Sequence, residues 1–448
     1  MRKSIVTAIF CGILLLFSNI ITANPIFSVT GTIITNGTPT PFSENIGAAD
    51  NIEKFIKEFD YTELKQRYTW NSTSTLQAEA NLRGFKLSMH YTANNEGHSI
   101  LVLTIPSSSF SPDAQTINEL KAHNITYNPE NNSLTFTGPA DAVNKKLKNS
   151  FGDRSVWDQL LDVLQGKIGS GELLHAITKA WIANTAIDPV AGNPDSFMAA
   201  LTNYNFNFAG QTILNGDTSG LDLFSLHPSY SSTSNNGFQV TTATLPLAYT
   251  HYFNRNNALM FSLPIQYQRV NNATTYSAAL GIGYTHVMLR TANHLAWSLS
   301  PSVYAGAVGS LDLGSGTGVY DTGLASRLQM PIGNFTVGMT NDVSYLSTMA
   351  IKIGDVKTPY DFDNWITKNG IDATYRLTHH FAVGGFYNRT DVISGETWYI
   401  SNVNEVGFRF AKLTGFNDAE YDFMNVSVGY LFANHDYDGV NATLTFNF

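Results

Sequence analysis

The chain has 448 residues and a formal net charge of −9, and only 14% of its residues are charged, against about 25% in a usual soluble protein. No basic stripe that could neutralise phosphates is present, which excludes nucleic acid as a partner. Aromatic residues reach 12%, and beyond the N-terminal segment no apolar run is long enough to form a spanning helix. This composition favours a β-barrel that crosses a membrane with its strands.

The N-terminus has the features of a signal peptide, residues 1–23. Two basic residues precede an apolar run from Ile5 through Phe17, and small and polar residues follow it up to Ala23. The run is too short to span a bilayer comfortably, so we expect cleavage after Ala23. Cys11, the only cysteine in the sequence, lies inside this segment, and the mature protein is therefore expected to contain no disulfide.

The next part of the chain predicts a flexible leader and then a small soluble domain. Residues 24–44 are rich in Thr, Ser, Asn, Pro and Gly, which is typical of loops. Residues 45–190 alternate between helical and strand periodicity and predict an α+β domain, and a linker is expected at 191–218. The expected elements are a helix from about Asp50, strands at 85–91 and 99–105, a helix that starts at Ser111-Pro112-Asp113, a hairpin at 125–137, and helices at 141–149, 156–164 and 173–182.

This domain shows no signature of an enzyme or a metal site. Neither a zinc-protease motif, a nucleophile elbow, a phosphate loop nor a metal-ligand spacing of Cys and His occurs in it. Its histidines are scattered, which favours ordinary surface positions. We therefore expect no cofactor and no metal.

Residues 219–448 predict an antiparallel transmembrane β-barrel. Alternating segments of about 10–16 residues follow one another, and eleven strands can be distinguished from Gln239 onward. Barrels of single bacterial chains have even strand numbers, so one more strand is expected within 219–231, which gives twelve; ten or fourteen remain alternatives. Prolines 246, 264 and 301 fall inside strand segments, where each removes a ladder hydrogen bond that a bulge would have to absorb.

The connections between these strands alternate in length. We expect short turns at one end of the barrel and longer polar loops at the other, as in outer-membrane barrels. The short connections are expected at 254–257, 290–294, 332–334, 378–380 and 412–421, and the long ones at 270–275, 309–317, 347–364, 388–398 and 433–439.

The last segment, Asp438–Phe448, alternates strictly between apolar and polar residues. It resembles the terminal signal by which bacterial outer-membrane barrels are recognised for insertion. The resemblance implies an outer-membrane location after export, with the lipid bilayer and the barrel-assembly machinery as partners. The residues of this expected insertion signal are Val440, Ala442, Leu444, Phe446 and Phe448.

Charged residues of both signs are expected inside the barrel. They either pair across strands in a narrow interior or contact something that fills it. The helix expected at 171–187, upstream of the first strand, is our candidate for that filling. The predicted lumen-lining charges are Asp321, Arg327, Asp342, Lys368, Asp372, Arg376, Glu405 and Arg409.

A soluble domain, a helix and then a barrel resemble the translocator end of autotransporters, which implies that the barrel anchors or translocates the domain. Two alternatives remain open, namely a porin-like channel with a periplasmic accessory domain and an outer-membrane hydrolase. Candidate residues for the hydrolase are His251, His286, His379, His380 and the loop 434–439. Solvated turn chemistry explains these residues without catalysis and is the interpretation we favour, so we predict no catalytic residues. Among the three functions we favour the anchor or translocator.

Overall fold

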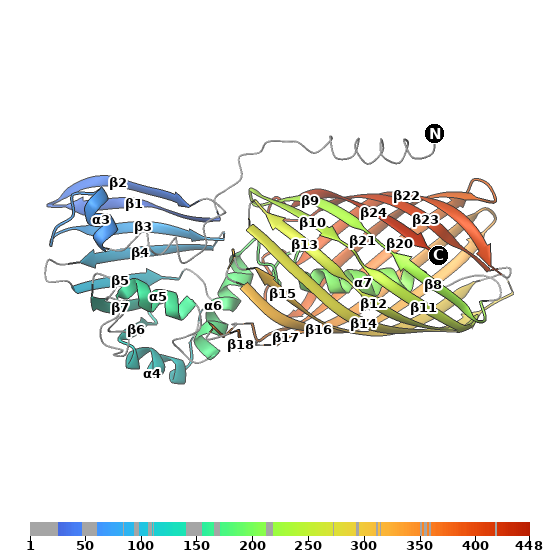
Figure 1. The fold of residues 1–448 in the computed structure, drawn as a ribbon, viewed down its shortest axis with the longest axis horizontal. Helices are drawn as coiled ribbons and strands as arrows, with labels where there is room; N and C mark the ends of the chain where they lie inside the picture. The colour runs from blue at the N-terminus through green and yellow to red at the C-terminus, as the bar shows by residue number, and fades with distance from the viewer. Residues whose placement is uncertain are drawn as a thin grey trace.

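The structure, a computed structural model, describes residues 26–46, 61–139, 155–164, 171–211 and 218–448 apart from short gaps. These gaps are 84, 94–97, 106–109, 111, 272, 293–294, 311, 314, 350–351, 354–355, 358–359 and 417–418. The expected signal peptide and the helices expected near Asp50 and at 141–149 lie outside this part of the chain. Within it, an N-terminal sheet and a barrel lie end to end, with helices between and inside them (Figure 1).

The N-terminal domain is built on a seven-stranded antiparallel sheet with the order β2-β1-β3-β4-β5-β7-β6. Its strands are β1 (Phe27–Thr35), β2 (Thr38–Ile46), β3 (Thr75–Leu82), β4 (Phe85–Ala93), β5 (His98–Thr104), β6 (Ile125–Asn128) and β7 (Ser133–Pro139), and its helices are α3 (Tyr61–Arg67), α4 (Ala114–Ala122) and α5 (Val156–Leu164). In β4 every second residue is buried, among them Tyr91, whose ring lies 5.0 Å from that of Trp157 in α5. The strands expected at 85–91 and 99–105, the hairpin at 125–137 and the helix at 156–164 are confirmed.

Two expectations for this domain need correction. Most of the expected leader, residues 24–44, is the hairpin β1–β2, because Asn36 and Gly37 take positive φ angles of 51° and 78° and form its tight turn. The helix expected from Ser111 begins later. Asp113 is the N-cap of α4, and its carboxylate accepts a 2.7 Å hydrogen bond from the Thr116 amide.

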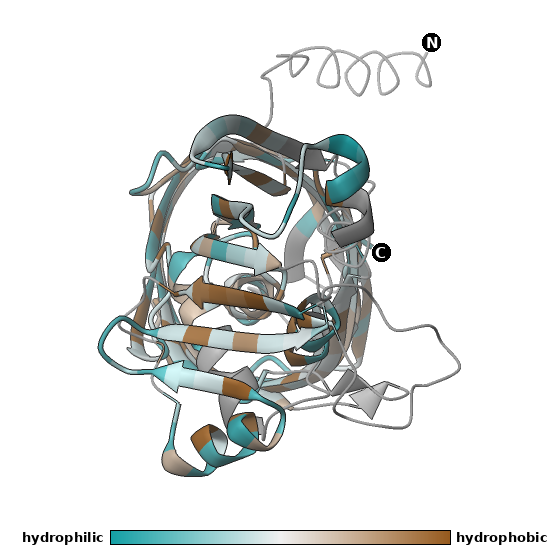
Figure 2. Cartoon of the chain, turned by 90° about the vertical axis from the view of Figure 1, so that its left-hand side faces the viewer, coloured by the Kyte–Doolittle hydropathy of each residue, from teal (hydrophilic) through white to brown (hydrophobic). Residues whose placement is uncertain are grey.

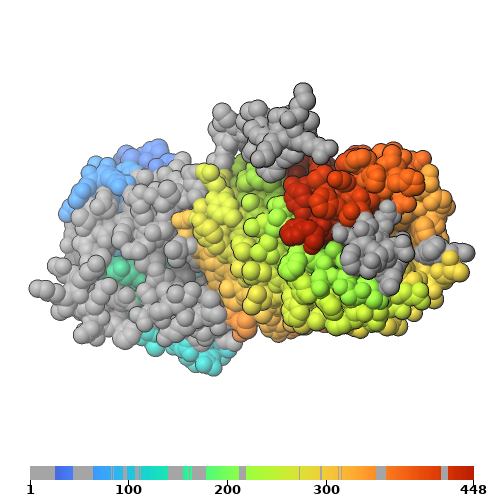
Figure 3. Space-filling model, turned by 45° about the vertical axis from the view of Figure 1, so that its right-hand side comes forward, coloured from blue at the N-terminus to red at the C-terminus, as the bar shows by residue number. Residues whose placement is uncertain are grey.

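The second unit is a closed barrel of twelve antiparallel strands, as predicted. Three of the twelve are each divided in two: β8 (Leu221–Leu226) and β9 (Ser229–Asn235), β10 (Phe238–Thr244) and β11 (Leu247–Asn254), β12 (Asn257–Leu263) and β13 (Ile265–Val270). The other nine are β14 (Ala273–Arg290), β15 (Ala296–Ser310), β16 (Ser315–Ile332), β17 (Phe335–Met349), β20 (Asp363–Arg376), β21 (Phe381–Gly395), β22 (Asn402–Phe416), β23 (Ala419–Phe432) and β24 (Asp438–Asn447). β24 closes the barrel by pairing with β8 and β9, and Figure 3 shows the two ends of the barrel sequence in contact.

The divisions fall at Pro228, Pro246 and Pro264, in three neighbouring strands. Each proline lacks an N–H, yet its carbonyl still accepts a hydrogen bond from the next strand: from Leu444 at 2.9 Å, from His227 at 3.1 Å and from Ala279 at 3.0 Å, respectively. At positions 246 and 264, where bulges were expected, the strand is instead interrupted, and the proline carbonyl still accepts a hydrogen bond from the neighbouring strand. Pro301 remains inside β15, opposite Leu324.

The barrel wall is apolar outside and polar inside. In β14 the outward residues include Leu280, which is 70% exposed, whereas the inward Ser277 and Thr285 are buried. The same alternation holds along β15 and β16. An exposed apolar band around a polar interior is the pattern of a transmembrane barrel. No helix of the described residues is long and apolar enough to cross a membrane.

The helix inside the barrel differs from the expected one. The expected filling, residues 171–187, is largely α6 (Gly171–Asn184), which lies between the sheet and the barrel, whereas α7 (Phe197–Gln211) runs within the lumen (Figures 1 and 2). α7 falls in the expected linker, 191–218. It contains no charged residue and has no clear apolar stripe, because all its sides face the barrel, so helical periodicity could not reveal it.

The N-terminal domain lies at the loop end of the barrel, the end that carries the long connections (Figure 1). The connection 350–362 is the longest, and it includes the short hairpin of β18 (Lys352–Ile353) and β19 (Val356–Lys357). The connections 396–401 and 433–437 lie at the same end. The loop expected at 270–275 is instead a tight turn, since β13 ends at Val270 and β14 begins at Ala273. The opposite end, here the turn end, holds the short connections.

Candidate functional site: the filled lumen and the closed mouth

Asn205 on α7 is the centre of the polar contacts in the lumen. Its amide nitrogen donates to the Asp321 carboxylate at 2.6 Å and to the Ser344 hydroxyl at 2.9 Å. Its amide oxygen accepts from the Ser302 hydroxyl. The three wall residues come from β16, β17 and β15. One asparagine therefore ties the helix to three strands, and buried amides and carboxylates need such partners.

A second attachment lies on β20. The Lys368 ammonium donates to the Asn203 side-chain oxygen at 2.6 Å and lies 4.9 Å from the centre of the Phe206 ring. The same ammonium is 3.9 Å from the Glu405 carboxylate of β22. Glu405 in turn accepts hydrogen bonds from Asn388 and Asn441. The positive charge of Lys368, which faces α7, is thus balanced by Glu405 of the wall, so the uncharged helix α7 need not supply a counter-charge.

Inward-facing glycines make room for the helix. A Cβ at Gly283 would lie 2.7 Å from the Phe208 ring, and one at Gly370 would lie 2.6 Å from the Phe206 ring. At Gly323 a Cβ would overlap the Asn205 amide. Ordinary side chains at these positions would push α7 away from the wall. The wall is therefore shaped to the helix that occupies it.

Nearer the turn end, the predicted charges pair with one another. Asp372 of β20 accepts from Arg327 of β16 at 2.8 Å and from Arg409 of β22 at 3.1 Å, so the cluster spans the wall from β16 to β22. Arg376 lies at the end of β20 on the same inward side as Asp372. Asp342 accepts a 3.0 Å hydrogen bond from Ser344 and is buried beside α7. Of the predicted charges, Arg327 and Arg409 therefore pair with Asp372, and Lys368 pairs with Glu405. Asp321 and Lys368 also bind the helix.

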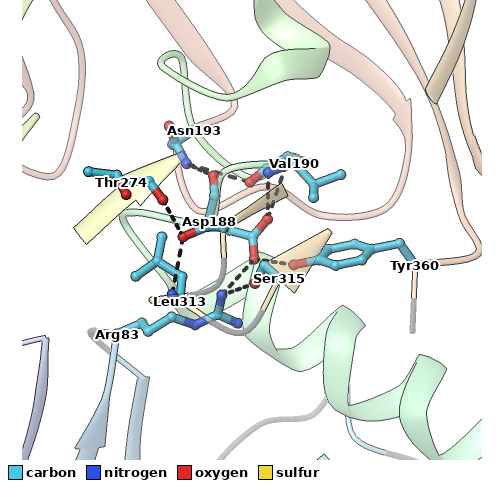
Figure 4. A network of polar contacts seen from close by, with 10 residues as sticks. Arg83, Asp188, Val190, Asn193, Thr274, Leu313, Ser315 and Tyr360 are labelled. Atoms are coloured by element: carbon cyan, nitrogen blue, oxygen red, sulfur yellow. Dashed lines mark hydrogen bonds and ion pairs between the residues drawn. The ribbon is translucent and has the colours of Figure 1, made fainter. Parts of the chain in front are cut away.

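The residues that connect α6 to α7, 185–196, form what we call the mouth segment, and nearly all of them are buried. Asp188 is its main polar anchor (Figure 4). The carboxylate accepts from the Tyr360 hydroxyl at 2.7 Å and from the Val190 amide at 2.9 Å. It also lies 3.6 Å from the guanidinium of Arg83, which comes from the turn between β3 and β4 in the N-terminal domain.

Arg83 joins the N-terminal domain to the mouth. Its side chain is 1% exposed, and the guanidinium lies 3.6 Å from the centre of the Trp181 ring in α6. It also donates to the Ser315 hydroxyl at the start of β16 (Figure 4). A single buried cation therefore contacts the domain, the mouth segment and the barrel wall. Buried charges of this kind require a partner, which Asp188 provides.

Asp195 is a second buried carboxylate of the mouth segment. It accepts from the Thr233 hydroxyl at 2.8 Å and from the Tyr437 hydroxyl at 3.3 Å, while Gln268 donates to its backbone carbonyl at 2.9 Å. No cation among the described residues pairs with it. Burial raises the pKa of Asp195 to about 6, because the hydroxyl donors compensate the desolvation only in part.

Backbone contacts complete the closure of the mouth. The side-chain amide of Asn235 donates to the Ala186 carbonyl at 2.5 Å. The backbone amides of Tyr399 and Ile400 donate to the carbonyls of Ile182 and Gly192 at 3.1 and 3.0 Å. Gly192 has a φ angle of +90°, and a Cβ there would lie 2.7 Å from the Ile182 carbonyl. Loops of the barrel thus hold the mouth segment from several sides.

The histidines considered for hydrolysis are not brought together. His251 binds Asp222 and His286 binds Asn257, both on the outer surface near the turn end. His379 and His380 lie in an exposed turn, and the His435 ring stacks on that of Tyr399 at 4.4 Å. In the described ranges no group of three or more His, Cys, Asp or Glu side chains is arranged to hold a metal ion.

Sequence reasoning missed Arg83, Asp188, Asn203 and Asn205. The mouth segment carries a usable signal, because Asp188, Pro189, Gly192, Asn193 and Pro194 are turn formers. Those residues separate two helices rather than forming a loose linker. No comparable local signal marks Arg83.

No protein-family model matches the sequence, and no curated protein matches it. Solved structures with a similar fold include the translocator domain of the autotransporter NalP from Neisseria meningitidis, with a TM-score of 0.39, 11% identity, and coverage of 56% of this chain and 94% of that one. The β domain of the Bordetella autotransporter BrkA has a TM-score of 0.36 at 11% identity, covering 51% of this chain and 100% of the other.

An outer-membrane channel from Pseudomonas putida F1 is similar to the same extent, with a TM-score of 0.36, 12% identity, and coverage of 51% of this chain and 96% of that one. The similar structures therefore include translocators as well as channels. The strand pairings of this chain by themselves form a closed antiparallel barrel of twelve strands.

Proposed function

We propose that this protein is an outer-membrane anchor that holds its N-terminal domain outside the cell, in the manner of an autotransporter. The proposal rests on the path of the chain through the barrel. α7 starts beside the mouth segment at the loop end, and its Asn205 reaches the middle of the wall. The next described residues, from Thr218, lie at the turn end, where Gly220 donates to the Tyr252 carbonyl.

The orientation follows from the two kinds of connection. In outer-membrane barrels the short turns face the periplasm and the long loops face the outside. The N-terminal domain lies at the loop end of this barrel (Figure 1). A domain at that end, linked through the lumen to the first strand, is displayed on the cell surface. We also propose that the barrel-assembly machinery recognises the outward side of the C-terminal residues and inserts the barrel into the membrane. Phe448, which directly follows β24, is 63% exposed on that side.

The filled lumen argues against a passive channel. α7 is bound to the wall through Asn203 and Asn205, and Arg83 and Asp188 hold the mouth above it. A porin needs a water-filled path, whereas this interior binds its own helix. We therefore expect no steady conductance from the full chain in a planar bilayer, and open channels there would favour the channel alternative.

Single cysteines test the topology directly, because Cys11 is the only native cysteine. Ser88 is exposed on β4 of the domain, and His379 is exposed in a turn at the turn end. We expect a membrane-impermeant maleimide to label Ser88→Cys on intact cells and His379→Cys only after the outer membrane is permeabilised. Labelling in the reverse order would place the domain in the periplasm and overturn the anchor. Digestion of residues 45–190 by protease on intact cells is the matching control.

A further inference from the structure

Lys368 is a buried amine that lies against a side-chain amide. It is 6% exposed, and its Nζ lies 2.6 Å from the Oδ1 of Asn203 on α7. Because a C=O bond is about 1.2 Å long, the amide carbon of Asn203, Cγ, lies within about 4 Å of the same nitrogen. Groups that are about to form a bond are held at about 3–3.5 Å. The contact therefore brings an amine close to attack on an amide.

The first of two neighbouring carboxylates, Glu405, supplies the counter-charge. It lies 3.9 Å from the Lys368 nitrogen. Its two oxygens accept from the side-chain amides of Asn388 at 3.0 Å and Asn441 at 2.6 Å. Charge-assisted hydrogen bonds of this kind hold an ionised carboxylate in a fixed position. Glu405 is thus suited to remain ionised and stationary.

The second carboxylate, Asp342, has an acceptor to spare. It lies directly opposite Lys368 in the pairing of β17 with β20, where opposing Cβ atoms are about 4.5–5.5 Å apart. One of its oxygens accepts from Ser344 at 3.0 Å. The other, Oδ1, is buried and accepts no hydrogen bond from any part of the chain that the structure describes. A carboxylate in this situation can take a proton from a buried ammonium, which leaves both groups neutral.

We propose that Lys368 and Asn203 form an isopeptide bond that joins α7 covalently to β20. Asp342 first takes a proton from the ammonium, which leaves a lone pair on Nζ. This lone pair attacks Cγ of Asn203 and forms the Nζ–Cγ bond. A second proton passes from Nζ to Nδ2 through the Asp342 carboxyl group, the Cγ–Nδ2 bond breaks, and ammonia leaves. The ammonia takes the proton that Asp342 still holds and departs as ammonium, so the reaction needs no other reactant.

The surroundings of the contact favour this reaction over hydrolysis of the amide. The Phe206 ring lies 4.9 Å from the Lys368 nitrogen and shields it from water, the competing nucleophile. Gly370 on β20 lets this ring approach, because a Cβ there would lie 2.6 Å from it. Asn203 is partly buried, which gives the released ammonia a route to solvent.

The bond provides a covalent tie that the chain cannot obtain from cysteine, because Cys11 is its only cysteine. It fixes the helix at residue 203 alone. The contacts of Asn205 stay noncovalent and still decide how closely the rest of α7 lies against the wall. Bond formation requires the folded barrel but no particular side of the membrane for the N-terminal domain. The bond and the proposed anchor can therefore fail independently of each other.

The test is the mass of the full chain before and after folding. We expect the chain recovered unfolded from inclusion bodies to have the mass of its sequence. After refolding in detergent it should be lighter by one ammonia, and a proteolytic digest should contain a branched peptide that joins residue 203 to residue 368. Heat-dependent mobility in SDS gels identifies the refolded barrel. A refolded barrel of unchanged mass would overturn the proposal. Loss of ammonia without the branched peptide would overturn it too, since cyclisation of an asparagine also releases ammonia.

Two substitutions remove the reacting atoms. Lys368→Arg keeps a cation beside Glu405, but its guanidinium is always protonated and is not a nucleophile. Asn203→Ala removes the carbon that is attacked and leaves the lysine in place. We expect neither variant to lose ammonia on refolding, and a branched peptide from residue 368 in the alanine variant would assign the bond to another partner.

A third substitution tests the proton transfer. Asp342→Asn keeps both reacting groups but cannot take the proton, so bond formation should be slower by about a hundredfold or more. Lys412→Arg is the matched control, because Lys412 lies 5.3 Å from the Phe423 ring but is exposed. This control should form the bond at the wild-type rate. An unchanged rate in Asp342→Asn would overturn the step assigned to that carboxylate.

Discussion

The N-terminal sheet and the barrel use the same two-residue alternation but bury opposite classes of residue. In β4 the side that faces away from solvent is apolar, with Phe85, Leu87 and Met89. In β14 the buried side is polar, and Leu280 faces outward. The apolar side of a strand faces whichever surroundings are free of water, a helix-covered core in one case and lipid in the other.

This difference explains how the two units stay in contact. An apolar core closes by packing alone, whereas a polar lumen must satisfy each buried donor and acceptor. The barrel does so with the asparagines of α7, and the mouth does so with Asp188 and Asp195. The N-terminal domain contributes Arg83 to that polar set. The junction combines this polar set with a buried apolar cluster, which extends from the N-terminal sheet through Ile187 to Phe238 and Val240 of the barrel.

Arg83→Met is expected to have the largest effect. It leaves the Asp188 carboxylate buried without a cation, which costs about 3–5 kcal/mol when one partner of such a pair is removed. The Val190 and Ala191 amides donate to this carboxylate, so their hydrogen exchange should accelerate strongly. Conductance bursts in a planar bilayer should accompany the loosened mouth.

Lys86→Met is the matched control, since Lys86 pairs with Glu79 on the exposed surface of the same domain. The double variant Arg83→Met/Asp188→Asn should recover much of the lost protection, because no unpaired charge then remains buried. Unchanged exchange at Val190 in Arg83→Met would show that the junction does not depend on this ion pair.

The second prediction contrasts two exposed apolar residues. Leu280→Arg places a charge in the middle of the lipid-facing wall and should destabilise the folded barrel by about 2–4 kcal/mol. Ile100→Arg, on a 45% exposed position of β5, should change stability by less than about 0.5 kcal/mol, since that surface meets water. Unfolding of both variants in lipid vesicles by urea measures the difference. Equal effects would contradict an outward lipid-facing side.

Strand alternation and turn residues were sufficient to predict the twelve-stranded barrel and most of the N-terminal elements. The filling helix was misplaced because α7 carries neither charge nor an apolar stripe, the two signals by which helices are recognised. Arg83 could not be predicted, since its partner Asp188 lies about a hundred residues further along the chain and only the folded mouth brings them together. Local patterns predict elements, whereas contacts between distant residues require the fold.

The third prediction concerns pH. Asp195 has a pKa of about 6 in the folded protein, above its ordinary value of 3.8. The folded state therefore binds more protons than the unfolded state between these values, so stability is greatest below about pH 4 and falls as pH rises through 6. Asp195→Asn removes the free-energy cost of burying an ionised carboxylate, so the variant should be more stable than wild type at pH 7.5, by roughly 2–3 kcal/mol at most.

Thermal unfolding from pH 4 to pH 8 measures this effect, and the gap between the two proteins should close toward pH 4. Asp113 in the N-terminal domain serves as a contrast, because its hydrogen bonds to Thr116 lower its pKa. The stability that ionised Asp113 contributes is lost as pH falls, whereas the contribution of Asp195 is lost as pH rises. A constant gap between Asp195→Asn and wild type at every pH would rule out ionisation of Asp195 as the cause.

The smallest expected effect comes from Asn205→Ala in the lumen. The substitution removes the donor to Asp321 and Ser344 and leaves buried acceptors unpaired, at about 1–2 kcal/mol. α7 should then leave the wall more often, which gives brief conductance events in a planar bilayer without detaching the domain. Asn207→Ala, an exposed position on the same helix, is the matched control. If both variants conduct equally, helix propensity rather than the Asn205 contacts holds α7 in the barrel.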